Sequence, residues 1–122
     1  MISERFRQLA RTSNAGLELV LRAGQSPQME AIVGSEWCGY NTPWLTKVLG
    51  IQKFIKGFFQ GPQTTEGYNT PAVQNGIDGL WLAQPSPETP RRFGFYTVTH
   101  VEPSARDNFY PQSLLLDYGA SQ

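Results

Sequence analysis

The stretch RFGFYTVTHV, residues 92–101, carries the clearest β-strand pattern in the chain. Neighbouring side chains of a strand point to opposite faces of a sheet, so the stretch presents two sets of side chains. One set contains Phe93, Phe95, Thr97, Thr99 and Val101, and the other contains Gly94, Tyr96, Val98 and His100. Aromatic and β-branched residues in this alternation predict a strand and favour a β-rich fold.

The composition agrees with a β-rich domain. The chain has 122 residues, enough for one domain with its own core, and it contains 12 Gly, 9 Pro and 12% aromatic residues. Aromatic residues combined with so much turn chemistry favour short strands and loops over a helical bundle. We therefore expect a single domain over 1–122, with a helical N-terminal segment at 1–32 and a β-rich body at 33–122.

Charge and cysteine content narrow the classes of function. Ten basic and ten acidic residues cancel, so the long-range attraction of a nucleic-acid or anionic-membrane binder is absent. The chain has one cysteine, Cys38, and one histidine, His100, which excludes an internal disulfide and an ordinary zinc site. We expect no metal, no cofactor, no nucleic-acid partner and no membrane partner. Because no signal-peptide core or spanning stretch is present, a soluble, cytoplasmic protein is predicted.

The N-terminal segment reads as helix. Ser3 suits an N-cap, and apolar residues recur at helical spacing until Gly24, with a possible break near residues 12–14. Ser26 and Pro27 then resemble a cap followed by the first position of another short helix. The apolar face predicts that this helical segment packs on the sheet.

The remaining elements follow from local signals. Strands are predicted at 33–40, 80–83 and 111–118, with a strand and hairpin turn at 72–79 and a short helix at 42–50 capped by Thr42. Residues 51–59 fit a helix or a buried strand by their spacing, and Gly57 favours the strand. The fold class is therefore α+β and β-rich, a curved antiparallel sheet or partial barrel with an N-terminal helix packed on it.

The pentapeptide GYNTP occurs twice, at 39–43 and at 67–71. Gly permits positive φ, Asn tolerates the left-handed region, and Thr before Pro suits the start of a helix or turn. We expect both copies to form corners at strand ends and to place Tyr40 and Tyr68 at the rim of one sheet.

The segment GSEWCG, residues 34–39, is followed by VLGI at 48–51 and by Lys53 and Phe54. This middle third of the chain resembles the GXWXG-type domain of uncharacterised bacterial proteins. The resemblance implies a β-rich, lipocalin-like partial barrel, and it assigns no catalytic residues.

One catalytic hypothesis uses Cys38 as nucleophile, His100 as base and Asp107 or Asp117 as the group that orients the base. A thiol needs a nearby base or cation to ionise at neutral pH. The competing interpretation is structural, since lone cysteines are commonly buried and lone histidines commonly pair with structural groups. The corresponding function is a small cofactor-independent hydrolase or isomerase using His100.

Basic and aromatic residues also lie together in two places, with Lys53 and Lys56 around Phe54 and Phe58, and with Arg91 and Arg92 beside Phe93. Such platforms can stack bases and neutralise phosphate. The neutral net charge argues against nucleic acid, and lysines of this kind often protect a strand edge.

A ligand pocket is the function class that we favour. Aromatic and amide side chains on successive strands can line the mouth of a barrel, although such aromatics also commonly fill a core. The predicted ligand-binding residues are Trp37, Tyr40, Asn41, Phe54, Phe58, Tyr68, Asn69, Trp81, Tyr96 and His100. The predicted function is binding of a small apolar or aromatic molecule.

The last predicted strand is strongly apolar and lies near the C-terminus. Leu114, Leu115 and Leu116 suggest an edge covered by a second protomer, or a chain that continues into further strands. A homodimer through residues 113–118 is expected from the first alternative. A structural or self-associating domain is accordingly the third function that we consider.

Overall fold

The computed structural model describes residues 2–101, 110 and 112–119, and these residues form four helices and five strands. The helices are α1 (Glu4–Ala10), α2 (Asn14–Ala23), α3 (Met29–Ile32) and α4 (Trp44–Val48). The strands are β1 (Glu36–Tyr40), β2 (Lys53–Gln60), β3 (Thr65–Pro71), β4 (Phe93–His100) and β5 (Leu114–Asp117).

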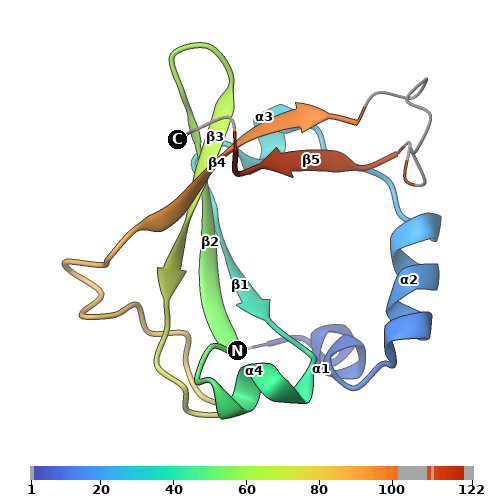
Figure 1. Ribbon diagram of the computed structural model, residues 1–122, viewed down its shortest axis with the longest axis vertical. Helices are drawn as coiled ribbons and strands as arrows, with labels where there is room; N and C mark the ends of the chain where they lie inside the picture. The colour runs from blue at the N-terminus through green and yellow to red at the C-terminus, as the bar shows by residue number, and fades with distance from the viewer. Residues whose placement is uncertain (1, 102–109, 111, 120–122) are drawn as a thin grey trace.

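The strands form one antiparallel sheet in the order β1-β2-β3-β4-β5, in which each strand pairs with its neighbour in the sequence. The sheet curls into a half-barrel, with β1 and β5 as its edges (Figure 1). The predicted fold class, α+β with a curved antiparallel sheet or partial barrel, is confirmed. The strands predicted at 51–59, 92–101 and 111–118 correspond to β2, β4 and β5.

Glycine and an aromatic residue face each other directly in three successive strand pairs. These pairs are Gly39 with Phe54, Gly57 with Tyr68, and Gly67 with Tyr96. In each pair the ring lies flat on the glycine, because an added Cβ would be 2.2 to 2.3 Å from the nearest ring atom. Only glycine leaves room for the ring, so these pairs let large rings cover the backbone of a tightly curled sheet.

We call the side of the sheet that carries Phe54, Lys56 and Phe58 the inner face. In a flat sheet, β2 and β5 would lie about 14 Å apart. Nevertheless Lys56 of β2 donates a hydrogen bond of 2.8 Å to the hydroxyl of Tyr118, just after β5. This contact over two intervening strands agrees with a sheet that is concave on its inner face.

One end of the inner face holds the core. Tyr96 and Val98 are fully buried there, and Ile32 of α3 packs on them. Tyr96 also donates a hydrogen bond of 2.8 Å to the carbonyl oxygen of Gly57. The part of the N-terminal segment that is buried against the sheet is therefore α3, whereas α1 and α2 contain no buried residue.

The loop between β3 and β4 folds around the ammonium group of Lys53, which is 2% exposed. This group donates hydrogen bonds to Oδ1 of Asn75 and to the carbonyl oxygens of Gly76, Gly79 and Leu80, the last three at 2.8, 3.0 and 3.2 Å. It also lies 3.9 Å from the ring centroid of Trp81. Helix α1 contacts the same loop, because Phe6 packs edge-on against Trp81.

The antiparallel return predicted over 72–83 is present, but the two strands predicted there do not form. Its residues pair only through an isolated bridge between Ala72 and Ala83. The carbonyl groups of Gly76, Gly79 and Leu80 point to Lys53 instead of joining a strand ladder. A buried cation from another strand thus outweighs the local turn signals.

The two GYNTP copies differ in structure. The first ends β1 and leads to α4, whose N-cap is Pro43 and not the predicted Thr42. The second lies within β3, so the corner predicted around Tyr68 is wrong, and Tyr68 is buried under Phe59 and Phe95. Gly67 suits a strand here because the ring of Tyr96 takes the place of its missing side chain.

Because of a bulge in β4, Phe93 lies on the opposite face of the sheet from the one predicted. Three residue steps on β4, from Tyr96 to Phe93, match two steps on β3, from Gly67 to Asn69. The extra residue is accommodated at Gly94, whose φ of +56° suits glycine. Phe93 consequently lies on the inner face, whereas Phe95 contacts Tyr68 on the other side of the sheet.

The break predicted near residues 12–14 is confirmed, since Ser13 caps α2 by accepting a hydrogen bond of 3.1 Å from the amide of Gly16. Ser3 caps α1 in the same way, through the amide of Phe6 at 3.0 Å. Among the described residues, no helix has the length and apolar character needed to cross a membrane.

Candidate functional site

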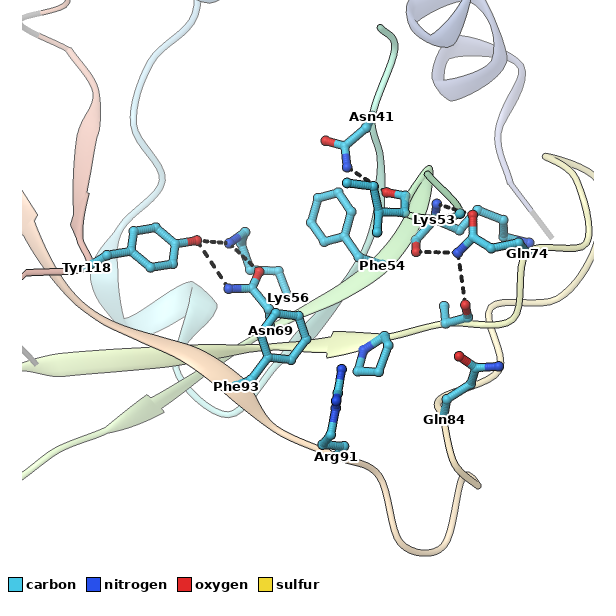
Figure 2. Close-up of a pocket in the computed structure, with 14 residues that line it drawn as sticks. Asn41, Lys53, Phe54, Lys56, Asn69, Gln74, Gln84, Arg91, Phe93 and Tyr118 are labelled. Atoms are coloured by element: carbon cyan, nitrogen blue, oxygen red, sulfur yellow. Dashed lines mark hydrogen bonds between the residues drawn. The ribbon is translucent and has the colours of Figure 1, made fainter. Parts of the chain in front are cut away.

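A pocket with a volume of about 380 Å³ opens on the inner face, at the end of the sheet away from α3. Figure 2 shows side chains from β2, β3, β4 and the segment after β5 turned toward it. Strand alternation on β2 brings both Phe54 and Lys56 to this face. Asn69 stands directly opposite Lys56 in the register, and Phe93 follows at the bulge.

At one end of the pocket, three polar side chains form hydrogen bonds with one another. We call these residues, Lys56, Asn69 and Tyr118, the Lys56 trio. The ammonium group of Lys56 donates hydrogen bonds of 2.8 Å to Oδ1 of Asn69 and of 2.8 Å to the hydroxyl of Tyr118. Nδ2 of Asn69 donates to the same hydroxyl at 3.2 Å and to the carbonyl oxygen of Gly94 at 3.0 Å. The trio links β2, β3 and the segment after β5.

Aromatic rings surround the cation of the trio. The ammonium group of Lys56 lies 4.5 Å from the ring centroid of Tyr96, 5.5 Å from that of Tyr118 and 5.8 Å from that of Phe54. The negative faces of aromatic rings attract cations. This packing holds the amine at a defined place in the pocket.

The trio also changes the acidity of Tyr118. Burial raises the pKa of the phenol, but the hydrogen bonds from Lys56 and Asn69, together with the charge of Lys56, outweigh burial and lower the pKa below its ordinary value. A lower pKa makes the Tyr118 hydroxyl a stronger hydrogen-bond donor.

The other end of the pocket is a rigid wall. The side chain of Gln74 binds the backbone of Lys53, accepting from its amide at 2.9 Å and donating to its carbonyl oxygen at 2.8 Å. Nδ2 of Asn41 donates to the carbonyl oxygen of Ile51 at 2.8 Å. The guanidinium group of Arg91 lies 5.1 Å from the ring centroid of Phe93. The side chains of Gln74 and Asn41 are thus engaged in hydrogen bonds to the backbone of Lys53 and Ile51, whereas the guanidinium group of Arg91 is not part of these bonds.

The pocket has a positive electrostatic character. The described residues that line it include Lys53, Lys56 and Arg91 but no aspartate or glutamate, and the ammonium group of Lys53 lies in the 74–81 loop. In the part of the chain that the structure describes, neither Lys56 nor Arg91 has a carboxylate within ion-pair distance. The charge of Lys53 is satisfied by the loop oxygens, which leaves Lys56 and Arg91 as the cations available to a ligand.

The structure brings three of the ten predicted ligand-binding residues to this pocket: Asn41, Phe54 and Asn69. The others are distributed over the molecule. Phe58, Tyr68 and Tyr96 pack in the interior, Trp37 and Trp81 border a separate hollow beside α1, Tyr40 lies against α1 and α2, and His100 is exposed at the end of β4.

The candidate catalytic residues do not come together. Cys38 is on β1 and His100 is on β4, with β2 and β3 between them, and the register places them on opposite faces. Asp117 of β5 is opposite Thr97, on the other face from His100. Asp107 lies outside the described residues. Among the described residues, no group of three or more His, Cys, Asp or Glu is placed to hold a metal ion.

Sequence reasoning missed Lys56, Arg91, Phe93 and Tyr118 as pocket residues. The basic and aromatic residues at 53–58 and 91–93 carry the signal, but their pattern alone fits a nucleic-acid platform or, for the lysines, protection of a strand edge. In fact β2 and β4 are interior strands of the sheet, so Lys56 protects no edge. No local pattern pointed to Tyr118, because only the curl of the sheet brings it to β2.

Comparisons with known proteins found no match to this chain, whether with protein-family models, curated proteins or solved structures. The resemblance to the GXWXG-type domain therefore stays a prediction.

Proposed function

We propose that this protein binds a small apolar or aromatic molecule in the pocket on the inner face. The observation that carries the proposal is an open cavity of about 380 Å³ on the concave face, walled by Phe54 and Phe93 and with the Lys56 trio at one end. Apolar walls with a few convergent polar groups are typical of small-molecule sites, whose volumes start at about 300 Å³.

A solid core is the competing explanation for inward-facing aromatics. It accounts for the end of the inner face where Ile32, Tyr96 and Val98 are buried. At the pocket end, by contrast, Phe93 remains 44% exposed and Tyr118 41% exposed. Aromatic surface left open inside a curved sheet favours an occupant from solution.

The binding proposal can be tested with the fluorescent neutral aromatic N-phenyl-1-naphthylamine, whose emission rises in apolar surroundings. We expect Phe93→Ala to lower its affinity by about tenfold, which corresponds to about 1.4 kcal/mol of lost apolar contact. Phe95→Ala is the matched control, because Phe95 is on the same strand, is 43% exposed and faces away from the pocket.

Equal losses in the two variants, or no enhanced emission with the unaltered protein, would contradict the proposal. Circular dichroism of both variants establishes that they remain folded. Native mass spectrometry of the purified protein then shows whether an aromatic or apolar compound accompanies it.

Self-association is a second candidate function. Strand β5 is an edge of the sheet, and Leu115 on it is 49% exposed. An exposed apolar edge strand favours pairing with a second copy. We expect sedimentation velocity at about 50 µM to show a dimer that Leu115→Lys disrupts, whereas Leu19→Lys on the exposed side of α2 leaves it intact. A monomer in the unaltered protein would rule this candidate out.

A cytoplasmic location and the lack of nucleic-acid and membrane partners stay predictions from the sequence. They are compatible with a small-molecule binder of neutral net charge.

A further inference from the structure

The hydrogen-bonding capacity of the Lys56 trio is almost used up. Asn69 accepts from Lys56 through Oδ1, and its amide hydrogens go to Gly94 and Tyr118. The hydroxyl oxygen of Tyr118 accepts from both Lys56 and Asn69. A phenol oxygen has two lone pairs, so both acceptor positions are taken.

What remains unused in the trio is a set of donors. Tyr118 still has its own O–H, and Lys56 has a third N–H after donating to Asn69 and Tyr118. The amide orientation of Asn69 does not change this result. Reversing it would set the NH₂ group of Asn69 against the ammonium of Lys56, donor to donor. A ligand group that meets the trio must therefore accept hydrogen bonds.

The positive charge of the site favours an anionic acceptor group over a neutral one. Lys56 and Arg91 lack a carboxylate partner among the described residues, and the pocket lining contains no acidic side chain. A partly buried cation without a counter-ion favours the entry of an anion, and charge-assisted hydrogen bonds are about twice as strong as neutral ones. An anionic acceptor consequently fits the trio better than a carbonyl or a hydroxyl group.

We infer that the ligand of this pocket is an aromatic or apolar carboxylate, held through its two oxygens by the free N–H of Lys56 and the O–H of Tyr118. The inference rests on the proposed function and specifies its ligand class. The two donor atoms lie 2.8 Å apart, a separation that suits the two oxygens of one carboxylate, and the body of the ligand would then lie along Phe54 and Phe93. Arg91, beside Phe93, adds a second positive charge at the same pocket.

The test compares 2-naphthoate with 2-naphthamide by isothermal titration calorimetry at neutral pH. The two probes share their shape, and only the first is charged. We expect the unaltered protein to bind the carboxylate about tenfold more tightly than the amide. Lys56→Met should remove most of this preference, leaving only the contribution of Arg91, while the amide still binds. Lys47→Met, which removes a charge from exposed α4 outside the pocket, should preserve the preference.

A second measurement uses the unaltered protein alone and does not depend on the folding of a variant. Raising NaCl from about 50 mM to about 500 mM should weaken binding of 2-naphthoate and leave binding of 2-naphthamide unchanged. Equal affinities for the two probes, or equal salt effects, would overturn the carboxylate inference and leave the pocket as a neutral aromatic site. Binding of neither probe would overturn the proposed function together with the inference.

Discussion

Gly67→Ala is expected to destabilise the protein by about 3 kcal/mol, the upper part of the range for overpacking a core. An alanine Cβ at this position would lie 2.2 Å from Cζ of Tyr96. The ring cannot move aside easily, because Tyr96 is fully buried and its hydroxyl is bonded to Gly57. Since folded domains are stable by only about 5–15 kcal/mol, such a loss is a large share of the total.

Urea denaturation followed by circular dichroism measures the change in the free energy of unfolding. Gly24→Ala is the matched control, because Gly24 has a φ of −78° and an added Cβ there would be 3.5 Å from its nearest neighbours. Its effect should be within about 0.5 kcal/mol.

The clash with Tyr96 can be separated from a general effect of alanine. In the double variant Gly67→Ala with Tyr96→Leu, the smaller side chain makes room for the Cβ. The double loss should therefore fall short of the sum of the single losses by at least about 1 kcal/mol. Additive losses would show that ring packing on Gly67 is not what the alanine disturbs.

Lys53→Met is expected to cost about 2–3 kcal/mol and to loosen the loop at 74–81. The substitution keeps the length and removes the charge. Four oxygen atoms of the loop then lose their donor, and Trp81 loses the cation 3.9 Å from its ring centroid. Burial lowers the pKa of Lys53, while the oxygen atoms around the ammonium group favour its charged form.

Hydrogen exchange locates this effect. The amide of Val73, bonded to Leu82 at 2.9 Å, and that of Gly79, bonded to Gly76 at 3.1 Å, should exchange at least about tenfold faster in Lys53→Met. Lys47→Met serves as the control with the same chemical change on an exposed helix. Unchanged exchange at both amides would show that the loop keeps its conformation without the buried cation.

The two stability predictions bear on the proposed site. Gln74 and Lys53, which border the loop at 74–81, form one wall of the pocket. The ring of Tyr96 on Gly67 lies 4.5 Å from the ammonium group of Lys56. Packing of glycine–aromatic pairs and the buried cation thus hold the pocket open and in shape.

The parts of the fold that depend on neighbours in the chain were accessible from residue spacing. Alternation at 92–101 indicated β4, Gly57 favoured a strand over a helix at 51–59, and a break in the first helix was predicted near residues 12–14. In each case the signal and the structure it produces lie within about ten residues, so tertiary contacts had little to override.

The site needed information that no short window contains. The two strands expected over 72–83 gave way to the carbonyl contacts with Lys53, and the face of Phe93 was reversed by the bulge at Gly94. Glycine within a strand is a recognised sign of a bulge, but the pairing with β3 determines where the extra residue is placed.

Spacing and turn chemistry therefore predicted the α+β, β-rich fold class, but they missed β3 and predicted strands within 72–83 that do not form. The tertiary structure decided which residues line the pocket. In the curled sheet, Lys56 of β2 contacts Tyr118, beyond β5, across two intervening strands. In the same curled sheet, rings pack on glycines in three strand pairs. The alternation that predicts a strand specifies the faces of its side chains, but it does not specify which distant residues the curvature will bring to the same face.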